Sequence, residues 1–132
     1  MKFSVASSEL LKALTRASGV VPSRSTLPIL ENYLFELTRD QLKITATDLE
    51  ISITTSLVVK GEDNGKVAIP AKRIMETIRA LPVTDLAFNV DSTSKKVTMT
   101  TKNGEYRLGS EGSEDYPAVN LPKSDGEMAI EK

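Results

Sequence analysis

Hydrophobic and polar residues follow two different periods along the first half of the chain. Residues 2–6 alternate between apolar and polar side chains, which predicts a half-buried strand. Residues 7–18 place apolar side chains three or four positions apart, which predicts an amphipathic helix. Three more alternating segments, at residues 32–38, 41–47 and 51–59, predict three further strands.

The second half of the chain repeats this order of elements. A strand is predicted at residues 66–69 and a helix at residues 71–81. Further strands are predicted at residues 85–90, 96–101 and 105–110.

The two halves also align residue by residue. Phe3 and Val5 of the first strand stand 64 positions before Val67 and Ile69. The helices keep this spacing, with Leu10, Leu11 and Leu14 matched by Ile74, Met75 and Ile78. The repetition indicates a β-α-β-β-β unit written twice, and hence an α+β fold with two helices packed on antiparallel sheets. The alternative is that short strands in any α+β domain produce such matches by chance.

Turn-forming residues separate several of these elements. We expect turns at residues 39–40 (Arg-Asp), 64–65 (Asn-Gly) and, between the last two strands, 103–104 (Asn-Gly). Ser7 or Ser8 is expected to cap the first helix through its side chain.

The last residues resemble the start of another copy of the unit. Residues 127–130 alternate like the strand at residues 66–69, and a polar connector at residues 116–126 precedes them. Such connectors join domains. We therefore expect one domain followed by the first strand of the next, within a longer protein.

The composition narrows the possible chemistry. The chain has no histidine and no cysteine, so it lacks the commonest general base, the commonest metal ligand and any disulfide. Residues 1–110 hold 15 basic and 12 acidic side chains, a net charge of +3, whereas residues 111–132 hold 2 and 6, a net charge of −4. Mild basicity of this kind permits phosphate contacts without requiring them.

Asp48 and Glu50 form a candidate cation site. On a strand, two positions apart, they would share one face and provide oxygen ligands. The alternative is that residues 47–50 form a turn, and two acids alone supply few of the ligands that a hard cation needs. Residues 61–66 lack the spacing of a phosphate-binding P-loop, and Val67 stands where Ser or Thr is required. We expect neither a metal nor a cofactor.

Basic residues lie on the polar sides of both predicted helices. Lys12 and Arg16 share one side of the first helix, and Lys72 and Arg79 share one flank of the second. Exposed lysines and arginines are common, so an ordinary solvated surface explains each of them. Arg24 differs because it lies in a loop with few apolar neighbours, where functional residues concentrate.

Four segments carry a resemblance to a known family: RSTLPIL (residues 24–30), TDLE (47–50), IPAKRIMETIRALP (69–82) and EDYP (114–117). In this order they are similar to the first domain of the bacterial DNA sliding clamp family, the beta subunits of DNA polymerase III. The resemblance runs from Met1 to about Pro122. It implies a DNA-clamp fold, with residues 1–122 as the first clamp domain and residues 123–132 as a linker and the first strand of a second.

The resemblance implies a function that depends on topology. In the family, each subunit has three such domains, and two subunits close head to tail into a homodimeric ring around duplex DNA. We therefore expect a non-catalytic processivity factor of DNA replication, acting in the cytoplasm, that tethers the replicative polymerase to DNA of any sequence. Contacts with the polymerase and the clamp loader are expected through domains absent from this chain.

The resemblance also implies site residues. Arg24 and Lys72 are the expected DNA contacts. The expected contacts with a second subunit are Arg73, Lys96, Tyr106 and Leu108. Asn103 and Glu105 stand where the family can carry basic residues, so the charge pairing across this interface departs from the family pattern.

The strand at residues 105–110 is expected to form a sheet edge that another chain extends. Tyr106 and Leu108 lie two positions apart, so they are expected on one face of it. The resemblance implies that the second subunit covers them.

A protein-interaction module without a nucleic-acid role is the competing interpretation. It requires an apolar patch on the outer faces of the helices, where the sequence places charges. An enzyme has less support, since no catalytic constellation is present in the sequence.

Overall fold

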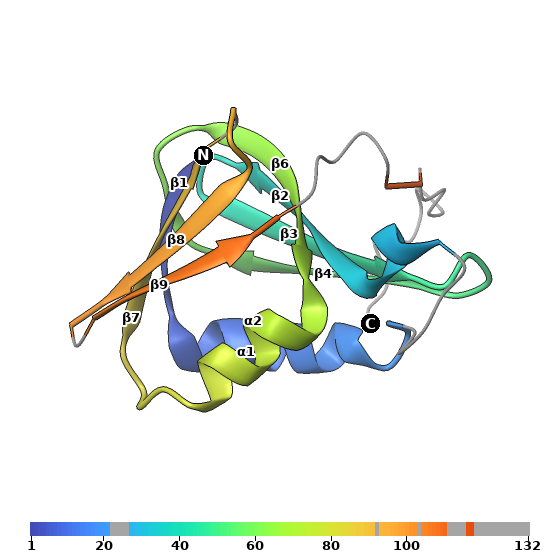
Figure 1. Ribbon diagram of the computed structural model, residues 1–132, viewed down its shortest axis with the longest axis horizontal. Coiled ribbons are helices and arrows are strands. Elements are labelled where there is room, and N and C mark those ends of the chain that lie inside the picture. Colours follow the sequence, from blue (N-terminus) through green and yellow to red (C-terminus); the bar gives the residue numbers. More distant parts are fainter. Residues whose placement is uncertain (22–26, 92, 103, 111–115, 118–132) are drawn as a thin grey trace.

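Two antiparallel sheets pack face to face, and two helices lie side by side across one open side of the pair (Figure 1). This computed structural model describes residues 1–21, 27–91, 93–102, 104–110 and 116–117. The predicted α+β class, with helices packed on antiparallel sheets, is confirmed.

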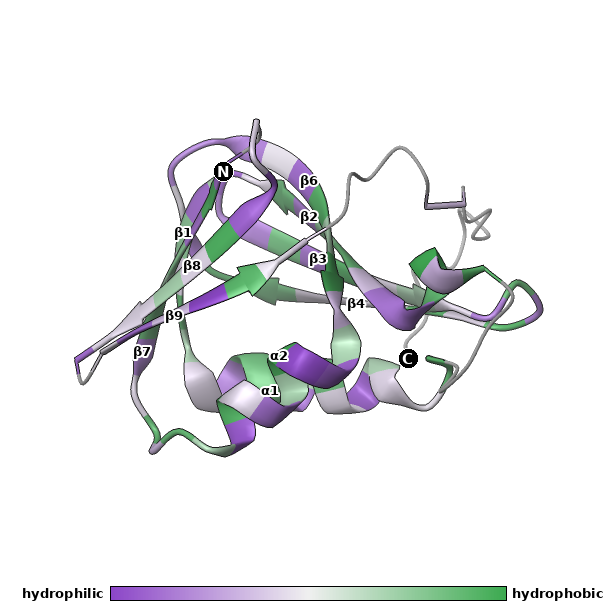
Figure 2. Cartoon of the chain, viewed as in Figure 1, coloured by the Kyte–Doolittle hydropathy of each residue, from purple (hydrophilic) through white to green (hydrophobic). Residues whose placement is uncertain are grey.

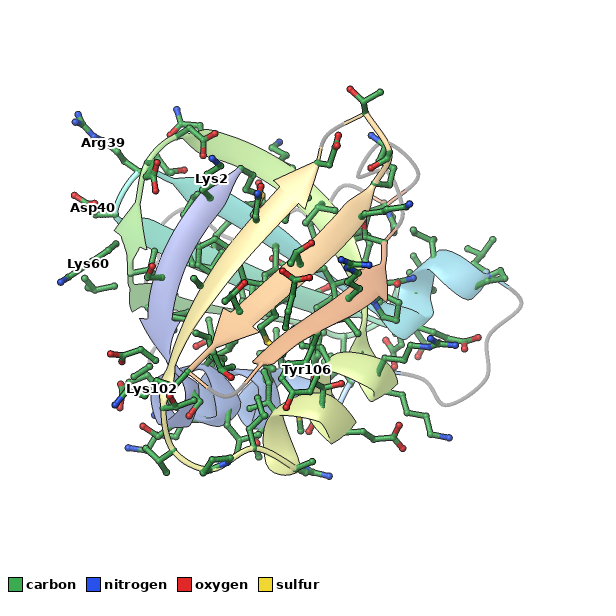
Figure 3. The ribbon with its side chains drawn as sticks, turned by 60° about the vertical axis from the view of Figure 1, so that its left-hand side comes forward. Lys2, Arg39, Asp40, Lys60, Lys102 and Tyr106 are labelled. Carbon is green, nitrogen blue, oxygen red and sulfur yellow. The ribbon has the colours of Figure 1, made fainter. Side chains whose placement is uncertain are left out.

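The first sheet has five strands in the order β5, β1, β7, β8, β9. They are β5 (Lys60–Gly61), β1 (Lys2–Ala6), β7 (Asp85–Asp91), β8 (Lys96–Thr101) and β9 (Gly104–Gly109). Figure 3 shows this sheet from its outer side, with β9 at one edge. The prediction that the last strand forms a sheet edge is confirmed.

The second sheet has four strands in the order β4, β3, β2, β6. They are β4 (Ser52–Val58), β3 (Gln41–Thr47), β2 (Asn32–Thr38) and β6 (Asn64–Pro70).

Three helical segments complete the described fold: α1 (Ser7–Ser18), the short 3-10 helix η1 (Pro28–Glu31) and α2 (Ala71–Arg79). Each α-helix directly follows the first strand of its copy, so the repeat predicted from sequence is present. Within the described residues, no helix has both the length and the apolar character needed to cross a membrane.

The two copies of the repeat are interlocked because they exchange their first strands. β1 pairs with β7, which places Phe3 opposite Phe88. β6 pairs with β2, which places Val67 opposite Phe35. Each sheet therefore combines the first strand of one copy with the other three strands of its partner copy. Neither copy can fold as a separate unit with this pairing.

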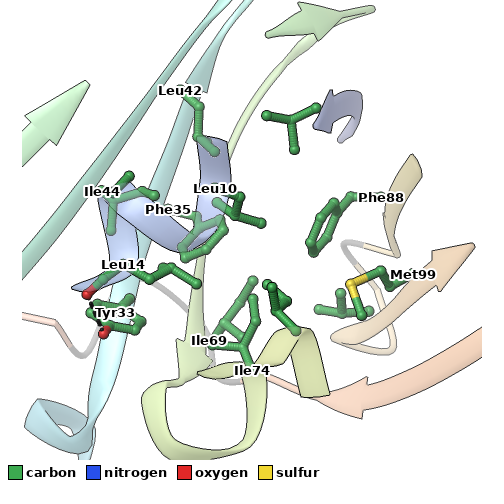
Figure 4. Close-up of a cluster of buried hydrophobic side chains, with 14 of the residues drawn as sticks. Leu10, Leu14, Tyr33, Phe35, Leu42, Ile44, Ile69, Ile74, Phe88 and Met99 are labelled. Carbon is green, nitrogen blue, oxygen red and sulfur yellow. Dashed lines mark hydrogen bonds between the residues drawn. The ribbon is translucent and has the colours of Figure 1, made fainter. Parts of the chain in front are cut away.

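A continuous apolar core fills the space between the sheets and the helices (Figure 4). Leu10 and Leu14 of α1 and Ile74 of α2 are completely buried in it. The rings of Phe3 and Phe88 stack with their centroids 4.7 Å apart, which fixes β1 against β7. Figure 2 shows the same division along the strands, where hydrophobic and hydrophilic positions alternate.

Tyr33 joins the second sheet to α1 inside this core. Its side chain is fully buried, and its hydroxyl donates a hydrogen bond of 2.8 Å to the carbonyl oxygen of Leu14. Burial raises the pKa of Tyr33 to about 12, and the nearby positive charge of Arg79 acts in the opposite direction.

The turns agree with the prediction at one site and differ at another. Residues 39–40 connect β2 and β3 as expected. Residues 64–65 are not a turn, because Asn64 and Gly65 begin β6 and the connection from β5 runs through residues 62–63. Asn64 Oδ1 accepts a 2.9 Å hydrogen bond from the Arg39 backbone N–H, so this asparagine closes the neighbouring turn instead. In the last hairpin Gly104 already pairs with Thr101, and Asn103 lies outside the described residues.

The predicted serine cap of α1 is wrong. The helix begins at Ser7, and the preceding residue, Ala6, provides no side-chain cap. Ser7 is buried, and its Oγ accepts a 3.0 Å hydrogen bond from the backbone N–H of Thr84. The Ser7 N–H donates to the Thr84 carbonyl at 2.8 Å. Ser7 therefore links the starts of α1 and β7, which are 77 positions apart.

Candidate nucleic-acid interface

The exposed sides of α1 and α2 form a basic surface, named the helix face below. The apolar stripes of both helices point into the core, so their charged side chains lie on the solvent side. The charged residues of the helix face are Glu9, Lys12, Arg16, Lys72, Arg73, Glu76 and Arg79. Five are basic and two are acidic, which gives a net charge of +3.

Most of these cations are unneutralised within the described part of the chain. Lys12 lies 3.6 Å from Glu9, and such an exposed ion pair contributes little. Four cations have no described carboxylate oxygen within 4.0 Å: Arg16, Lys72, Arg73 and Arg79. Among the described residues, nothing neutralises these four side chains, and each of them can donate hydrogen bonds to an anionic ligand.

A groove of about 540 Å³ runs between the two helices. Its apolar lining comes from Leu11, Ile78, Leu81 and Val83. Lys12, Arg16 and Arg79 also line it. Long cationic side chains around an apolar floor can contact phosphate groups with their ends and sugar rings with their stems.

A second hollow, of about 1350 Å³, lies where η1, α2 and the end of β9 meet. Lys72, Arg73 and Arg79 line it. The expected DNA contact Arg24 lies outside the described residues. Val21 and Leu27, the described residues on either side of its segment, both line this hollow.

The expected subunit contacts lie on α2, β8 and β9. Arg73 is exposed on α2, and Lys96 is exposed at the start of β8, opposite Gly109 of β9. Gly109 also lines the hollow that Arg73 lines. Arg73 and the end of β9 thus line the same hollow, and Lys96 pairs with that end of the strand.

Tyr106 and Leu108 share one face of β9 as expected, but it is the inner face. Leu108 is only 8% exposed and lies opposite the buried Val97. Tyr106 is half-buried, lies opposite Met99 and packs against the core. β9 therefore presents its backbone edge, not an exposed apolar pair.

The outer face of β9 is polar. Glu105 and Arg107 form an exposed ion pair with a distance of 3.0 Å between the carboxylate oxygen and the guanidinium nitrogen. Glu105 is thus already paired within the chain. Asn103, the other residue that departs from the family pattern, lies outside the described residues.

Asp48 and Glu50 lie in a turn, as predicted by the alternative interpretation of residues 47–50. Asp48 Oδ1 accepts backbone hydrogen bonds from Ile51 (2.7 Å) and Glu50 (2.9 Å), and these bonds hold the pKa of Asp48 below its usual value. The described residues contain no group of three or more His, Cys, Asp or Glu side chains placed to hold a metal ion.

Sequence reasoning did not single out Arg16 and Arg79 as a pair. Each was visible as a polar-side cation of its own helix. Their placement along one groove depends on how α1 packs beside α2, and a helical period does not contain that information.

Residues 1–122 match the family described as DNA polymerase III beta subunit, N-terminal domain. The chain belongs to this family. The beta sliding clamp of Vibrio cholerae is 28% identical over 131 residues, which covers 98% of this chain and 36% of that protein. The beta sliding clamp of Chlamydia muridarum is 33% identical over 119 residues, which covers 90% of this chain and 32% of that protein.

Solved structures of the family share the fold. A putative DNA polymerase III beta subunit from Eubacterium rectale matches with a TM-score of 0.87 at 28% identity, over 92% of this chain and 33% of that chain. A DNA polymerase sliding clamp from Caulobacter crescentus matches with a TM-score of 0.85 at 28% identity, with the same coverage. The expected clamp fold is confirmed, and the chain spans about a third of the length of these relatives.

Proposed function

We propose that the chain is the first domain of a ring-shaped sliding clamp that encircles duplex DNA and tethers the replicative DNA polymerase. The helix face is the observation that carries the proposal. It has a net charge of +3, and four of its five cations have no described ion-pair partner. Flexible cationic side chains contact phosphates without reading the base sequence, which is the kind of contact a sliding protein needs.

Weak contact suits this role better than tight binding. A closed ring stays on DNA because it cannot dissociate sideways, so its affinity for phosphate can remain low. Each phosphate contact releases counterions and adds to the salt-dependent affinity. A strongly basic helix face would therefore retard sliding. In this proposal Lys72 and the segment with Arg24 contact one strand, and Lys12, Arg16 and Arg79 contact DNA along the groove.

The domain boundaries follow from the same proposal. Residues 1–122 form the first clamp domain, and residues 123–132 form a linker and the first strand of the next domain. The whole protein is a non-catalytic processivity factor that works in the cytoplasm. It contacts the polymerase and the clamp loader through domains that lie beyond this chain.

Ring closure is proposed at the β9 edge. No described strand pairs with its outer side, so a strand of a second subunit could pair there and continue the first sheet across the boundary. In this proposal Arg73, which lines the same hollow as Gly109 of β9, and Lys96, which pairs with Gly109, also contact the second subunit. Leu108 and Tyr106 would act from the inner face, by holding β9 in register against β8.

Retention on circular DNA tests the proposal. The whole protein, loaded on a nicked circular duplex, should stay bound at physiological salt and be released when the circle is cut. The 132-residue chain should bind circular and linear duplex equally weakly, because it supplies only part of a ring. Release of the whole protein from intact and cut circles at the same rate would contradict encirclement.

A further inference from the structure

β4 forms one edge of the second sheet, and no described strand pairs with its outer side. It is the last strand of the first copy of the repeat, as β9 is of the second copy. A strand at a sheet edge presents a row of backbone N–H and C=O groups that can pair with a further strand. Natural proteins therefore protect such edges with charged side chains, with proline or by keeping the edge strand very short.

The other three edges of the two described sheets carry such protection. β5 is only two residues long. β6 carries the exposed Lys66 and ends at Pro70. β9 carries the exposed ion pair between Glu105 and Arg107. Each of these features limits indiscriminate pairing with another chain.

β4 carries none of these features. Residues 51–59 contain no charged side chain, no proline and no glycine. Most of them are isoleucine, threonine or valine, which favour strands. Val58, at the end of β4, is 84% exposed. Uncharged segments of this length and strand propensity pair with identical copies of themselves, because no like charges oppose the contact.

We propose that the β4 edges of two copies of this chain pair antiparallel about a two-fold axis at Thr55, which joins their second sheets into one. In this register all seven residues of β4 have an opposite residue. Ile53 of each copy then lies opposite Leu57 of the other. Both side chains are only partly buried against the core, so the pairing covers more of their apolar surface. Because α1 contacts β4, the α1 helices of both copies lie on one side of the joined sheet. The contact depends neither on DNA nor on the β9 edge.

This register brings position 56 of one copy close to position 56 of the other. Ser56 is exposed, and it lies directly opposite Thr54 of the second copy. It is therefore the diagonal neighbour of its own counterpart across the axis. Diagonal neighbours on adjacent strands lie about 7–8 Å apart, within reach of long side chains. A charge introduced at this position meets the same charge in a dimer of identical chains.

Opposite charges at Ser56 test both the contact and its register. Sedimentation equilibrium of the 132-residue chain should show a reversible equilibrium between monomer and dimer. Ser56→Lys and Ser56→Glu should each raise the dissociation constant of the dimer by at least about fivefold, because like charges meet across the axis. An equimolar mixture of the two variants should dimerise more strongly than either variant alone. A wild-type chain that stays monomeric up to about 1 mM, or a mixture that associates no more strongly than its components, would overturn the proposal.

Two control variants place the same lysine elsewhere. Asn89 is exposed on β7, in the interior of the first sheet, so Asn89→Lys adds its charge away from any sheet edge. Glu105→Lys alters the charge of the β9 edge instead. Both variants should dimerise as the wild type does. If either control weakens the dimer as much as Ser56→Lys does, net charge or the β9 edge governs association and the proposal is wrong.

Amide hydrogen exchange distinguishes a second copy from another part of the same chain. The backbone amides on the outer side of β4 should become better protected as the wild-type concentration rises. Ser56→Lys should remove this dependence on concentration. Protection of β4 that is the same at all concentrations would mean that the chain covers its own edge, and it would contradict pairing between copies.

Discussion

The helix face and the outer surface of the second sheet use the same basic residue types in opposite ways. On the sheet, Glu36 lies opposite Lys43 on β3 and opposite Lys66 on β6. It pairs with them at 3.7 Å and 3.5 Å. On the helix face, four cations have no described carboxylate partner. Strand register thus places a carboxylate between two lysines, whereas four of the five cations on the helices have no carboxylate partner in the described part of the chain. The comparison identifies the helices as the surface suited to phosphate.

The largest expected effect comes from removing the core support beneath the helix face. Leu14 is completely buried on α1. Leu14→Ala should lower the free energy of unfolding by about 2–5 kcal/mol, because it reduces apolar burial and leaves a cavity behind. Urea denaturation followed by circular dichroism measures this, with the exposed Thr15→Ala as control. A decrease no larger than that of Thr15→Ala would show that the face does not depend on this packing.

The hydrogen bond from the Tyr33 hydroxyl to Leu14 joins the second sheet to α1, and its contribution to stability should fall at high pH. The folded pKa of Tyr33, about 12, exceeds its unfolded value of 10.0, so the folded state favours the protonated hydroxyl. Its contribution is fully present below pH 10 and is lost as the pH rises toward about 12. Tyr33→Phe should cost about 1 kcal/mol at neutral pH and reduce the loss of stability above pH 10. Superimposable pH profiles for the two proteins would refute this assignment.

A matched pair of neutralised carboxylates sharpens the comparison between the surfaces. Glu76→Gln and Glu36→Gln remove the same charge, one from the helix face and the other from the second sheet. Glu76→Gln should strengthen duplex binding at low salt, and Glu36→Gln should not. Each should change stability by no more than about 1 kcal/mol. Fluorescence anisotropy with a short labelled duplex measures the affinities, and equal increases in affinity would mean that net charge alone governs binding.

The smallest expected effect concerns the turn that contains Asp48 and Glu50, away from the helix face. Backbone hydrogen bonds hold the pKa of Asp48 below its usual value of 3.8, so the folded state favours the carboxylate. This stabilisation is present above the unfolded pKa and is lost as the pH falls through the folded pKa. Asp48→Asn should therefore be less stable than the wild type at neutral pH, and the difference should shrink in acid. Thermal melts from pH 7 to pH 3 measure it, and a constant difference would contradict the assignment.

The elements were predictable because their periods differ. Alternation defined the strands and a three-to-four spacing defined the helices, and the repeat was confirmed at the first strands and helices of both copies. The exchange of β1 and β6 between sheets was not predictable, because the alternation of apolar and polar residues in a strand does not determine which strand it pairs with. Asn64-Gly65 failed as a turn signal because the Asn64 side chain serves the turn at Arg39.

For the candidate site too, the sequence pattern predicted which residues lie on which element but not how the elements pack. Lys72 was expected at an exposed position on α2, and it is exposed there. Alternation placed Tyr106 and Leu108 on one face of β9, but it could not say that this face is the inner one. The groove with Arg16 and Arg79 required knowledge of helix packing.

The salt dependence of duplex binding tests the central claim most directly. One variant of the 132-residue chain replaces Lys12, Arg16, Lys72 and Arg79 with Gln, and its control replaces Lys43, Lys60, Lys66 and Arg107 with Gln. Each variant removes four positive charges. The slope of log affinity against log salt should fall by about one unit for each phosphate that the helix-face variant no longer binds, and it should stay near the wild-type value in the control. Equal slopes in the two variants would contradict the assignment of the helices as the DNA-facing surface.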